Sequence, residues 1–427
     1  MKKVLIITYY WPPAGGPGVQ RWLKFVKYLR EFDIEPIVYK PTNPDYPLVD
    51  NSLLNEVPGD ITLLEQKIFE PYFLARFFSK KHTSAISSGI IPADSRQGFL
   101  QKVLLYIRGN FFIPDARRSW VKPSVKFLSD YITKHRIDTI ITTGPPHSMH
   151  LIGLNLVKRN KLKWVADFRD PWTQIGYHKK LKLTDSSELK HQNLEQQVLD
   201  TATHIITTSF TTRDEFEKQT TTPITVITNG YDEQGKIVVD PDSKFTLAHI
   251  GSLLSGRDPK NLWQVLGELI RENSSFRNHF QLKLVGAVSE EVLASIHEEG
   301  LGKNLLVVGY VSHSEAVKIQ RNSGVLLLIE INSKDTRGII PGKFFEYMAS
   351  KRPIIALGPE KWDVERILYE TGSGNYFNYF QKEELKHRIL AYYGLFLKDH
   401  LRSDSRNMEK YTRRNLTGKL AELLKKL

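Results

Sequence analysis

The stretch KKVLIITYYWPPAGGPGVQRWLKFVKYL, residues 2–29, sets the pattern by which the rest of the chain can be interpreted. It begins with an apolar run typical of a buried strand, passes through a turn with three glycines and three prolines, and ends in an amphipathic segment. Glycines at a strand-to-helix turn let the backbone approach a ligand, and the helix N-terminus offers free N–H groups to an anion. The stretch therefore predicts a strand, a phosphate-binding turn containing Gly16 and Gly18, and a helix.

The same turn departs from the dinucleotide-binding pattern in two places. Gly16 and Gly18 supply G-x-G, but Arg21 stands where a third glycine is expected. The next predicted strand, 35–40, ends in Lys40, where a dinucleotide enzyme places an acidic residue for the ribose. The pattern therefore argues against NAD, and a tight turn that only packs remains the alternative to a phosphate site.

The segment after the turn has helical spacing of its apolar residues. The expected buried face carries Val19, Trp22, Leu23, Val26 and Leu29. The expected solvent side carries Arg21, Lys24, Lys27 and Arg30.

Apolar runs alternate with amphipathic segments along the whole chain in two series. The first series comprises residues 3–9, 35–40, 138–144, 163–168, 204–209 and 224–229. The second comprises 245–251, 280–286, 305–311, 324–331 and 353–358. Continuous Val, Ile and Thr runs between helices favour parallel sheets covered on both faces, so we expect two doubly wound α/β domains. The polar stretch 232–244 marks the join, which gives domains of about 1–235 and 245–409, with a last helix at about 410–427.

Composition restricts the class of protein further. The 427 residues exceed what one core usually supports, and 41% hydrophobic with 25% charged residues is ordinary for a globular chain. The absence of cysteine excludes disulfides and thiol chemistry and suits a reducing cytoplasm. No run of about 18 apolar residues predicts a membrane span, and the apolar run at the amino terminus is too short for a signal peptide. The net charge of +13 points to anionic partners, although no nucleic-acid-binding signature accompanies it.

In the first domain, polar residues follow the predicted strands. His147 comes just after the strand at 138–144, and Asp167, Arg169 and Asp170 lie at the end of the strand at 163–168. The carboxyl ends of parallel strands are where such sheets bind ligands. We take His147 and Asp170 as catalytic candidates and Asp167 and Arg169 as candidate ligand contacts. A histidine satisfied within its proline turn and an Asp167–Arg169 ion pair are the simpler alternatives.

The second domain has its own anion-binding candidates. Arg257 and Lys260 follow the first strand of the series, and Gly342 and Lys343 open a short helix that carries Glu346. Cations beside a helix N-terminus suit a diphosphate, and a carboxylate suits ribose hydroxyls. No zinc-protease, Walker or serine-hydrolase motif and no acidic cluster with metal spacing is present, so we expect no metal.

Residues 69–120 interrupt the alternation with a segment rich in Phe, Tyr, Leu, Lys and Arg. Two interpretations stay open: helices packed on the first domain, or a surface that meets anionic lipid through Phe73 to Phe78 and Leu104 to Phe112. In the second case Arg76, Lys80, Lys81 and Arg108 would meet the headgroups.

Six motifs together resemble glycosyltransferase family 4, the retaining sugar-nucleotide transferases with the GT-B fold. They are YYWPPAGGPGVQRW, GPPHSMHLIG, WVADFRDPWT, ITNGYD, HIGSLLSGRDPKN and IPGKFFEYMASKRPIIALGPE, and the likeness extends over nearly the whole chain. The resemblance is greatest to the bacterial exopolysaccharide and cell-surface glycan branch.

This resemblance implies two Rossmann-like domains facing across a cleft, with a UDP- or GDP-sugar donor mainly on the second. It implies that Glu346 binds the ribose, that Arg257, and less certainly Lys260, bind the diphosphate, and that the Gly15–Gly18 loop faces the donor phosphates and acceptor. It also implies that the final helix crosses back to the first domain. Two positions depart from the family: Gly338 replaces a glutamate eight residues before Glu346, and Ser252 follows Gly251 where the family has arginine.

The implied reaction is retaining transfer of a sugar, without metal or cofactor, to a glycan or polyprenyl-diphosphate-linked acceptor. The implied location is the cytoplasm or the inner face of the plasma membrane. A non-transferring sugar-nucleotide epimerase and a basic protein that binds nucleic acid or membrane are the alternatives. The sequence leaves the nucleotide, sugar, acceptor and oligomeric state open.

Overall fold

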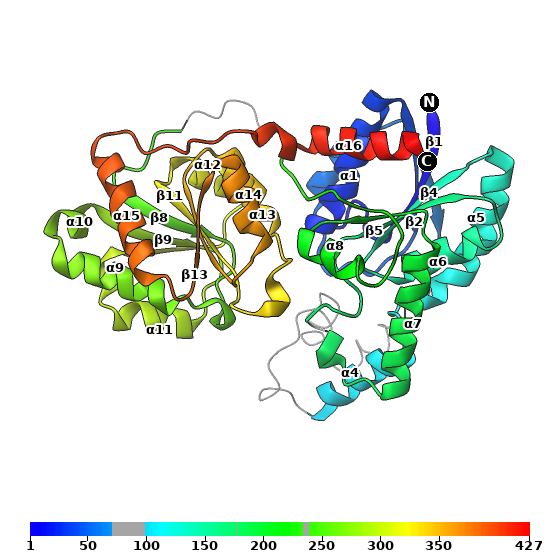
Figure 1. Ribbon diagram of the computed structural model, residues 1–427, viewed down its shortest axis with the longest axis horizontal. Coiled ribbons are helices and arrows are strands. Elements are labelled where there is room, and N and C mark those ends of the chain that lie inside the picture. Colours follow the sequence, from blue (N-terminus) through cyan, green and yellow to red (C-terminus); the bar gives the residue numbers. More distant parts are fainter. Residues whose placement is uncertain (71–98, 177, 234–238) are drawn as a thin grey trace. The chain divides into compact units, whose positions relative to one another are not determined.

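The computed structural model describes residues 1–70, 99–176, 178–233 and 239–427. The chain divides into two compact units, Met1–Thr228 with Arg413–Leu427, and Asn229–Thr412. Each unit is a parallel sheet with helices on both faces (Figure 1). The predicted pair of doubly wound α/β domains is confirmed.

The sheet of the first unit has seven strands in the order β3-β2-β1-β4-β5-β6-β7. All neighbours are parallel, and their bounds are β1 Lys2–Ile7, β2 Ile34–Pro41, β3 Thr62–Gln66, β4 Thr139–Gly144, β5 Lys163–Phe168, β6 His204–Thr207 and β7 Ile224–Val226. The chain order reverses between β1 and β4. The loops after these two strands therefore flank the switch point at which open α/β sheets bind ligands.

Both faces of this sheet are buried, which is why its central strands are continuous apolar runs. Along β1, Leu5 and Ile7 join one core cluster, while Val4 and Ile6 join another on the opposite face. The first cluster is covered by α5 (Val121–His135), α6 (Ser148–Val157) and α7 (Asp185–Thr201).

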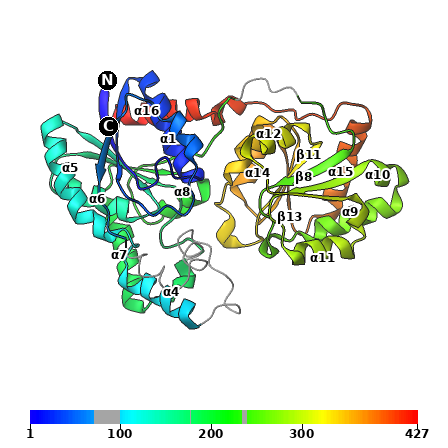
Figure 2. The same cartoon turned by 180° about the vertical axis from the view of Figure 1, so that it is seen from behind.

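The other face is covered by α1 (Pro17–Leu29) and α16 (Arg413–Lys426), which lie side by side in both views (Figures 1 and 2). Lys2 Nζ donates to Leu424 O at 2.7 Å, so the two chain termini lie close together. The last helix therefore belongs to the first unit.

The predicted apolar face of α1 is confirmed, because all five of its residues are buried. The prediction that Arg21 and Lys24 point to solvent is wrong, since their exposed fractions are 5% and 7%. Acidic partners account for the difference: Arg21 binds Asp167, and Lys24 pairs with Glu56.

The sheet of the second unit has six parallel strands in the order β10-β9-β8-β11-β12-β13. Their bounds are β8 Phe245–Ile250, β9 Phe280–Val285, β10 Leu305–Gly309, β11 Val325–Ile329, β12 Ile354–Gly358 and β13 Gly374–Asn378. The helices are α9 Lys260–Glu272, α10 Ser274–His279, α11 Glu290–Glu298, α12 His313–Asn322, α13 Gly342–Ala349, α14 Asp363–Thr371 and α15 Lys382–Leu397. Here the order reverses between β8 and β11, so the loops after those two strands flank the second switch point.

Two further helices of the first unit are α4 (Phe99–Phe111) and α8 (Phe210–Phe216). Leu105 of α4 packs against Leu181 and Leu183, so part of the aromatic and basic segment is a helix docked on the first unit. Phe73–Phe78, Arg76, Lys80 and Lys81 lie outside the described residues. None of the described helices is long and apolar enough to cross a membrane.

Candidate functional site

The second switch point is built around Lys343, the second residue of α13. Its Nζ lies 3.1 Å from Ile250 O, at the end of β8, and 3.2 Å from His249 Nε2. Gly251 follows with φ of 120°, and a Cβ added there would lie 3.2 Å from the same Nζ. Glycine thus permits both the backbone turn and the close approach of the amine.

The surroundings of Lys343 disfavour its charged form. Burial is the main cause that lowers the pKa of Lys343 to about 7; the nearby Arg257 guanidinium acts in the same direction, and Glu330 opposes it. His249 is fully buried, and burial followed by the charge of Lys343 holds its pKa well below the usual value. A neutral imidazole and a half-protonated amine therefore meet at the end of β8, where a bound anion would favour the ammonium form.

Arg257 is fixed by a buried carboxylate in the loop after β11. Its Nε lies 3.0 Å from Glu330 Oε1 and its Nη2 lies 3.3 Å from Glu330 Oε2. The carboxylate of Glu330 is 1% exposed, whereas the side chain of Arg257 is 34% exposed. Glu330 also accepts from Ile331 N, and its carbonyl accepts from Tyr379 OH at 2.8 Å. The guanidinium thus keeps an accessible side while its other side is held.

Glu346 lies one helical turn after Lys343 on α13. Its two oxygens accept from His313 Nε2 at 3.2 Å and Gln320 Nε2 at 3.3 Å. Gly342, the first residue of α13, follows Pro341, whose side chain offers no cap to the N–H groups of the first turn. The structure therefore places Arg257, Gly342, Lys343 and Glu346 around one switch point.

Lys260 stands apart from the interactions described above for Arg257, Lys343 and Glu346. It is the first residue of α9, its side chain is exposed, and no hydrogen bond or ion pair joins it to Arg257 or Glu346 in the described part of the chain. Its phosphate role stays a prediction.

In the first unit, the glycine turn and Arg169 are in contact. A Cβ added to Gly18 would lie 1.8 Å from Arg169 Nη1, so a larger residue there would have to displace this guanidinium. Arg169 donates from Nε to Gly144 O at 3.3 Å, contacts Pro145 O, and lies over the ring of Tyr10. Gly16 has φ of 97° and no atom near its missing Cβ, so there the backbone conformation itself calls for glycine.

Asp167 connects the elements beneath that turn. It is fully buried and accepts from Arg21 Nη2 at 2.9 Å, Trp22 Nε1 at 2.7 Å and Thr143 Oγ1 at 2.8 Å. Burial raises its pKa, but the charge of Arg21 and these hydrogen bonds outweigh burial and hold the pKa below its usual value. The Asp167–Arg169 ion pair was the simpler alternative to a functional role for these two residues; in the structure the ion-pair partner of Asp167 is Arg21.

His147 lies at the N-cap of α6, 5% exposed, with its ring stacked on Trp172 at 5.0 Å and 7°. Neither ring nitrogen has a hydrogen-bond partner within the described residues. Burial, followed by the nearby His150, holds the pKa of His147 well below its usual value, so the ring is neutral. Asp170 is exposed two residues before Trp172.

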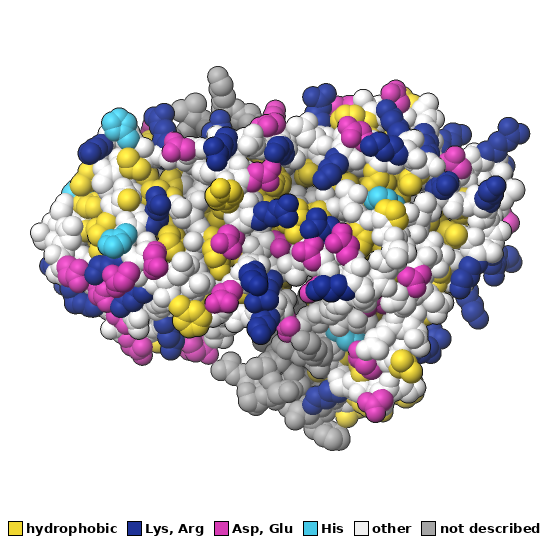
Figure 3. Space-filling view, viewed as in Figure 1, with side chains coloured by type: hydrophobic (Ala, Val, Ile, Leu, Met, Phe, Trp, Pro, Cys, Tyr) yellow, Lys and Arg dark blue, Asp and Glu magenta, His cyan; other side chains and the backbone are white. Residues whose placement is uncertain are grey.

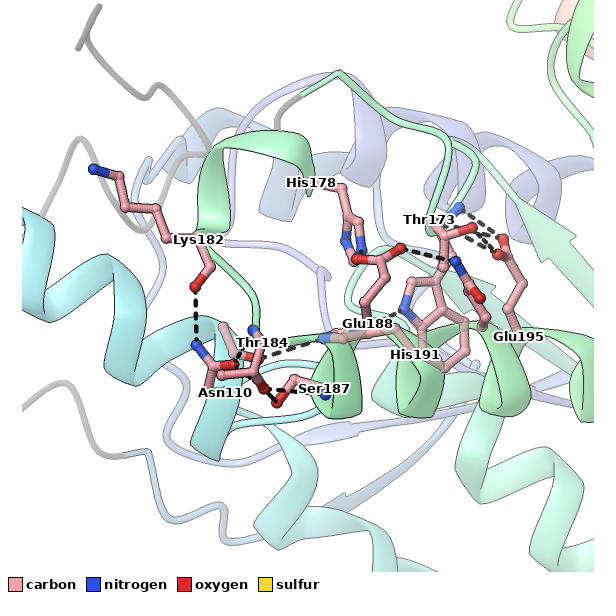
Figure 4. Close-up of polar contacts among 12 residues, drawn as sticks. Asn110, Thr173, His178, Lys182, Thr184, Ser187, Glu188, His191 and Glu195 are labelled. Atoms are coloured by element: carbon pink, nitrogen blue, oxygen red, sulfur yellow. Dashed lines mark hydrogen bonds and ion pairs between the residues drawn. The ribbon is translucent and has the colours of Figure 1, made fainter.

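A polar network holds Trp172 against His147. Trp172 Nε1 donates to His191 Nδ1 at 3.0 Å, and its backbone N donates to Glu195 Oε1 at 3.1 Å. Figure 4 shows Glu195 with Thr173 at one end of this network and His191 beside His178 and Glu188 in its middle. The loop after β5 is thereby fixed by α7.

Sequence reasoning placed Trp172 after the strand at 163–168 but missed His249 and Glu330 as parts of these sites. His249 sits inside an apolar run and carried no local signal. Glu330 directly follows the run VLLLI, and a lone carboxylate at the carboxyl end of a buried strand could have identified it.

Comparison with protein-family models and with curated proteins finds no match. Solved structures do match. A glycosyltransferase from Rickettsia africae gives a TM-score of 0.60 at 13% identity, over 100% of this chain and 98% of that one. An Anabaena protein in complex with UDP-glucose gives 0.58 at 12%, over 100% of both chains. A protein described as a UDP-N-acetylglucosamine 2-epimerase from Listeria monocytogenes gives 0.56 at 11%, over 100% of this chain and 96% of that one. At these identities the likeness is one of fold, and the fold is the two-domain α/β GT-B fold.

Proposed function

We propose that the protein is a retaining glycosyltransferase that moves a sugar from a nucleoside-diphosphate sugar, with UDP or GDP, to a glycan or polyprenyl-diphosphate-linked acceptor in surface polysaccharide synthesis. The observation that carries the proposal is the grouping of Lys343, Arg257 and Glu346 around the switch point of the second unit. Two cations beside a helix N-terminus suit a diphosphate, and the carboxylate suits ribose hydroxyls. The fold shared with a UDP-glucose complex supports the same donor class.

The residues at this switch point would act on the leaving group. As the bond from the anomeric carbon to the phosphate oxygen breaks, negative charge grows on the diphosphate. Lys343, Arg257 and the first N–H groups of α13 then bind it more tightly than in the ground state. The acceptor hydroxyl attacks from the face that the diphosphate leaves, a bond to the anomeric carbon forms, and the hydroxyl proton passes to the diphosphate. No metal or other cofactor is required.

His147 and Asp170 are the proposed contacts to sugar or acceptor, with Arg169 beside the glycine turn. The ring of His147 is neutral and has free hydrogen-bonding capacity, which suits a sugar hydroxyl better than a charged group. Asp167 contacts protein groups on every side, so we assign it to holding α1 and β5 in place.

The same fold occurs in the Listeria structure described as an epimerase, so an epimerase is the second candidate. An epimerase would convert its nucleotide sugar with no acceptor present. Incubating a nucleotide sugar without acceptor, and analysing it by NMR for an inverted centre, separates the two activities.

We also propose that the protein works as a peripheral protein at the inner face of the plasma membrane. The helix α4 leaves Val103, Tyr106, Ile107 and Phe111 between 36% and 65% exposed. Apolar side chains of this kind can enter a membrane interface while Arg108 meets anionic headgroups. A nucleic-acid role has less support: on the face shown in Figure 3, Lys and Arg side chains are interspersed with acidic ones over both units.

The donor assignment is tested first by thermal shift against UDP, GDP, ADP and their sugars. Steady-state kinetics with varied donor then compare Arg257→Ala and Lys343→Ala with Lys303→Ala, an exposed lysine of the same unit. A hydrogen bond to a charged group contributes roughly 1.5–3 kcal/mol, so each site variant should lose about ten- to a hundredfold or more in kcat/KM. Glu346→Gln should weaken donor binding more than turnover, because the ribose changes little during transfer. Wild-type kinetics in both folded cation variants would refute the assignment.

A further inference from the structure

The first unit carries a hollow whose lining includes none of the residues proposed for transfer. It has a volume of about 920 Å³, within the range of small-molecule sites, and opens over the outer surface of α5 and α6. Its floor includes Val121, Val125 and Leu151, each at most 9% exposed. None of its lining residues belongs to the donor group at the second switch point.

Aromatic side chains form one wall of this hollow. Phe111 and Phe112 come from the end of α4, and Phe69 comes from the segment after β3. Phe69 is 64% and Phe111 65% exposed, which is unusual for rings of this size. Together with the aliphatic floor they offer an apolar surface to a ligand rather than to the protein core.

This wall is anchored rather than loose. Asn110, next to Phe111, accepts from Thr184 N at 2.8 Å and donates to Lys182 O at 3.2 Å, which ties the end of α4 to the start of α7 (Figure 4). On the other side, Ser119 Oγ donates to Phe69 O at 2.5 Å.

Cations form the rim. Arg118, in the 3₁₀ turn that leads into α5, is followed at intervals of four residues by Lys122 and Lys126 of α5. These three form a cation stripe, and Arg159 adds a fourth cation after α6. All four are exposed, none has an ion pair within the described residues, and no Asp or Glu lines the hollow. Like charges at this spacing repel one another, so an anion placed among them would be stabilised.

We propose that this hollow binds the phosphate end of a membrane lipid, with the phosphate on the cation stripe and the first part of the lipid chain against the aromatic wall. An amphiphilic anion fits both features of the hollow, because its apolar chain can contact the aromatic wall and its charge can pair with the cations. A free phosphate would leave the aromatic wall unused, and a neutral lipid would leave the cations unpaired. The site builds on the membrane association proposed above, with which it shares Phe111. It does not depend on the proposed sugar transfer, because it uses none of the residues assigned to that reaction.

The test is co-sedimentation of the full chain with vesicles of phosphatidylglycerol and of phosphatidylcholine. A cation near an anionic surface strengthens binding about fivefold, so reversing two of them in Lys122→Glu/Lys126→Glu should weaken binding to phosphatidylglycerol by about 25-fold or more. Lys134→Glu/Lys161→Glu reverses two exposed lysines of the same unit outside the hollow; it is the control with an equal change of charge and should lose about fivefold or less. Equal binding of Lys122→Glu/Lys126→Glu and this control, or equal binding of the wild type to both lipids, would overturn the proposal.

A second measurement separates a lipid site from a phosphate site. Calorimetric titration with dodecyl phosphate below its micelle concentration should show binding that Phe111→Ser weakens, whereas inorganic phosphate should bind far more weakly to either protein. If inorganic phosphate binds as tightly as dodecyl phosphate, or if Phe111→Ser leaves dodecyl phosphate binding unchanged, the hollow is not a lipid site. Donor turnover by the same variants, assayed with a water-soluble acceptor, should stay at wild-type level, so this result and the test of the transfer proposal can fail independently.

Discussion

Lys343 illustrates which properties of a single residue can be predicted from the sequence and which depend on the three-dimensional structure. Its place after a strand and at a helix start predicted an anion contact, but the contact with His249 and the low pKa depend on β8 and α13 meeting in three dimensions. Arg257 was likewise predicted as a phosphate contact, whereas its buried partner Glu330 lies 73 residues away in sequence. Local sequence pattern thus proposes candidate anion contacts, whereas tertiary packing sets the protonation state and the orientation of their side chains.

The first prediction concerns how the binding of a nucleotide sugar depends on pH. The pKa of Lys343 in the free protein is about 7, so its ammonium form is present below that pH and is lost above it. A bound diphosphate favours the ammonium form and raises this pKa. Binding of a nucleotide sugar, whose phosphates do not titrate in this range, should therefore weaken by up to tenfold per pH unit above about pH 7. Calorimetry between pH 6 and 9 measures the profile. Lys343→Arg keeps its charge and should give a flat one. A flat profile in the wild type would remove Lys343 from the anion site.

The second prediction isolates the contact between Gly18 and Arg169. Gly18→Ala should destabilise the protein by about 1–3 kcal/mol, because its Cβ would overlap the guanidinium. In an Arg169→Ala background the same change should be neutral or stabilise by up to about 1 kcal/mol, since alanine favours the helix.

Urea unfolding of the four proteins completes the cycle. Gly16→Ala is the control, because its cost comes from φ and should be equal in both backgrounds. Additive effects of Gly18→Ala and Arg169→Ala would show that the two residues do not touch.

At the scale of elements, the strands in the middle of each sheet and the edge strands β7 and β10 were predicted, whereas the other two edge strands were not. β1, β4 and β8 are buried on both faces and read as continuous apolar runs. β3 and β13 were missed, because each lies at a sheet edge and carries mostly partly exposed residues. The helix α1 was found from its spacing, but its polar residues were misplaced because a buried arginine cannot be recognised without its partner.

The third prediction tests the ion pair by which Asp167 of β5 binds Arg21 of α1. Asp167→Asn should cost about 3–5 kcal/mol of unfolding free energy, because it leaves Arg21 buried without a counter-charge. Asp130→Asn, at an exposed position on α5, should change stability by less than about 0.5 kcal/mol.

The difference in unfolding free energy between the wild type and Asp167→Asn should depend on pH and should become smaller in acid. The pKa of Asp167 in the folded protein lies below its usual value of 3.8. Its contribution is therefore present above about pH 4 and is lost as the pH falls through the folded value. Urea unfolding at several pH values should show a constant gap between wild type and Asp167→Asn from pH 5 to 8 that narrows in acid. A gap that persists unchanged in acid would show that packing rather than charge is responsible.

For the whole molecule, composition and alternation were enough to predict two α/β domains, and the structure divides the chain accordingly. The contribution of residues 413–427 to the first unit could be expected only from resemblance, because an amphipathic helix does not reveal which apolar surface it will cover. Leu416, Leu420 and Leu424 of α16 are buried in the cluster that α1 and β1 share. The most distant part of the sequence thus completes the core beneath the glycine turn.

The last prediction follows from this closure. Leu420→Ala should cost about 2–5 kcal/mol, because Leu420 is fully buried, whereas Glu422→Ala on the exposed side of α16 should be nearly neutral. Hydrogen exchange followed by mass spectrometry locates the effect. Amides of α1 and β1 should exchange faster in Leu420→Ala, while those of β8 and β11 in the second unit should keep wild-type rates, because α16 shares its core with the first unit alone. Equal acceleration in both units would mean that the chain unfolds as one cooperative body and that α16 does not stabilise the first unit selectively.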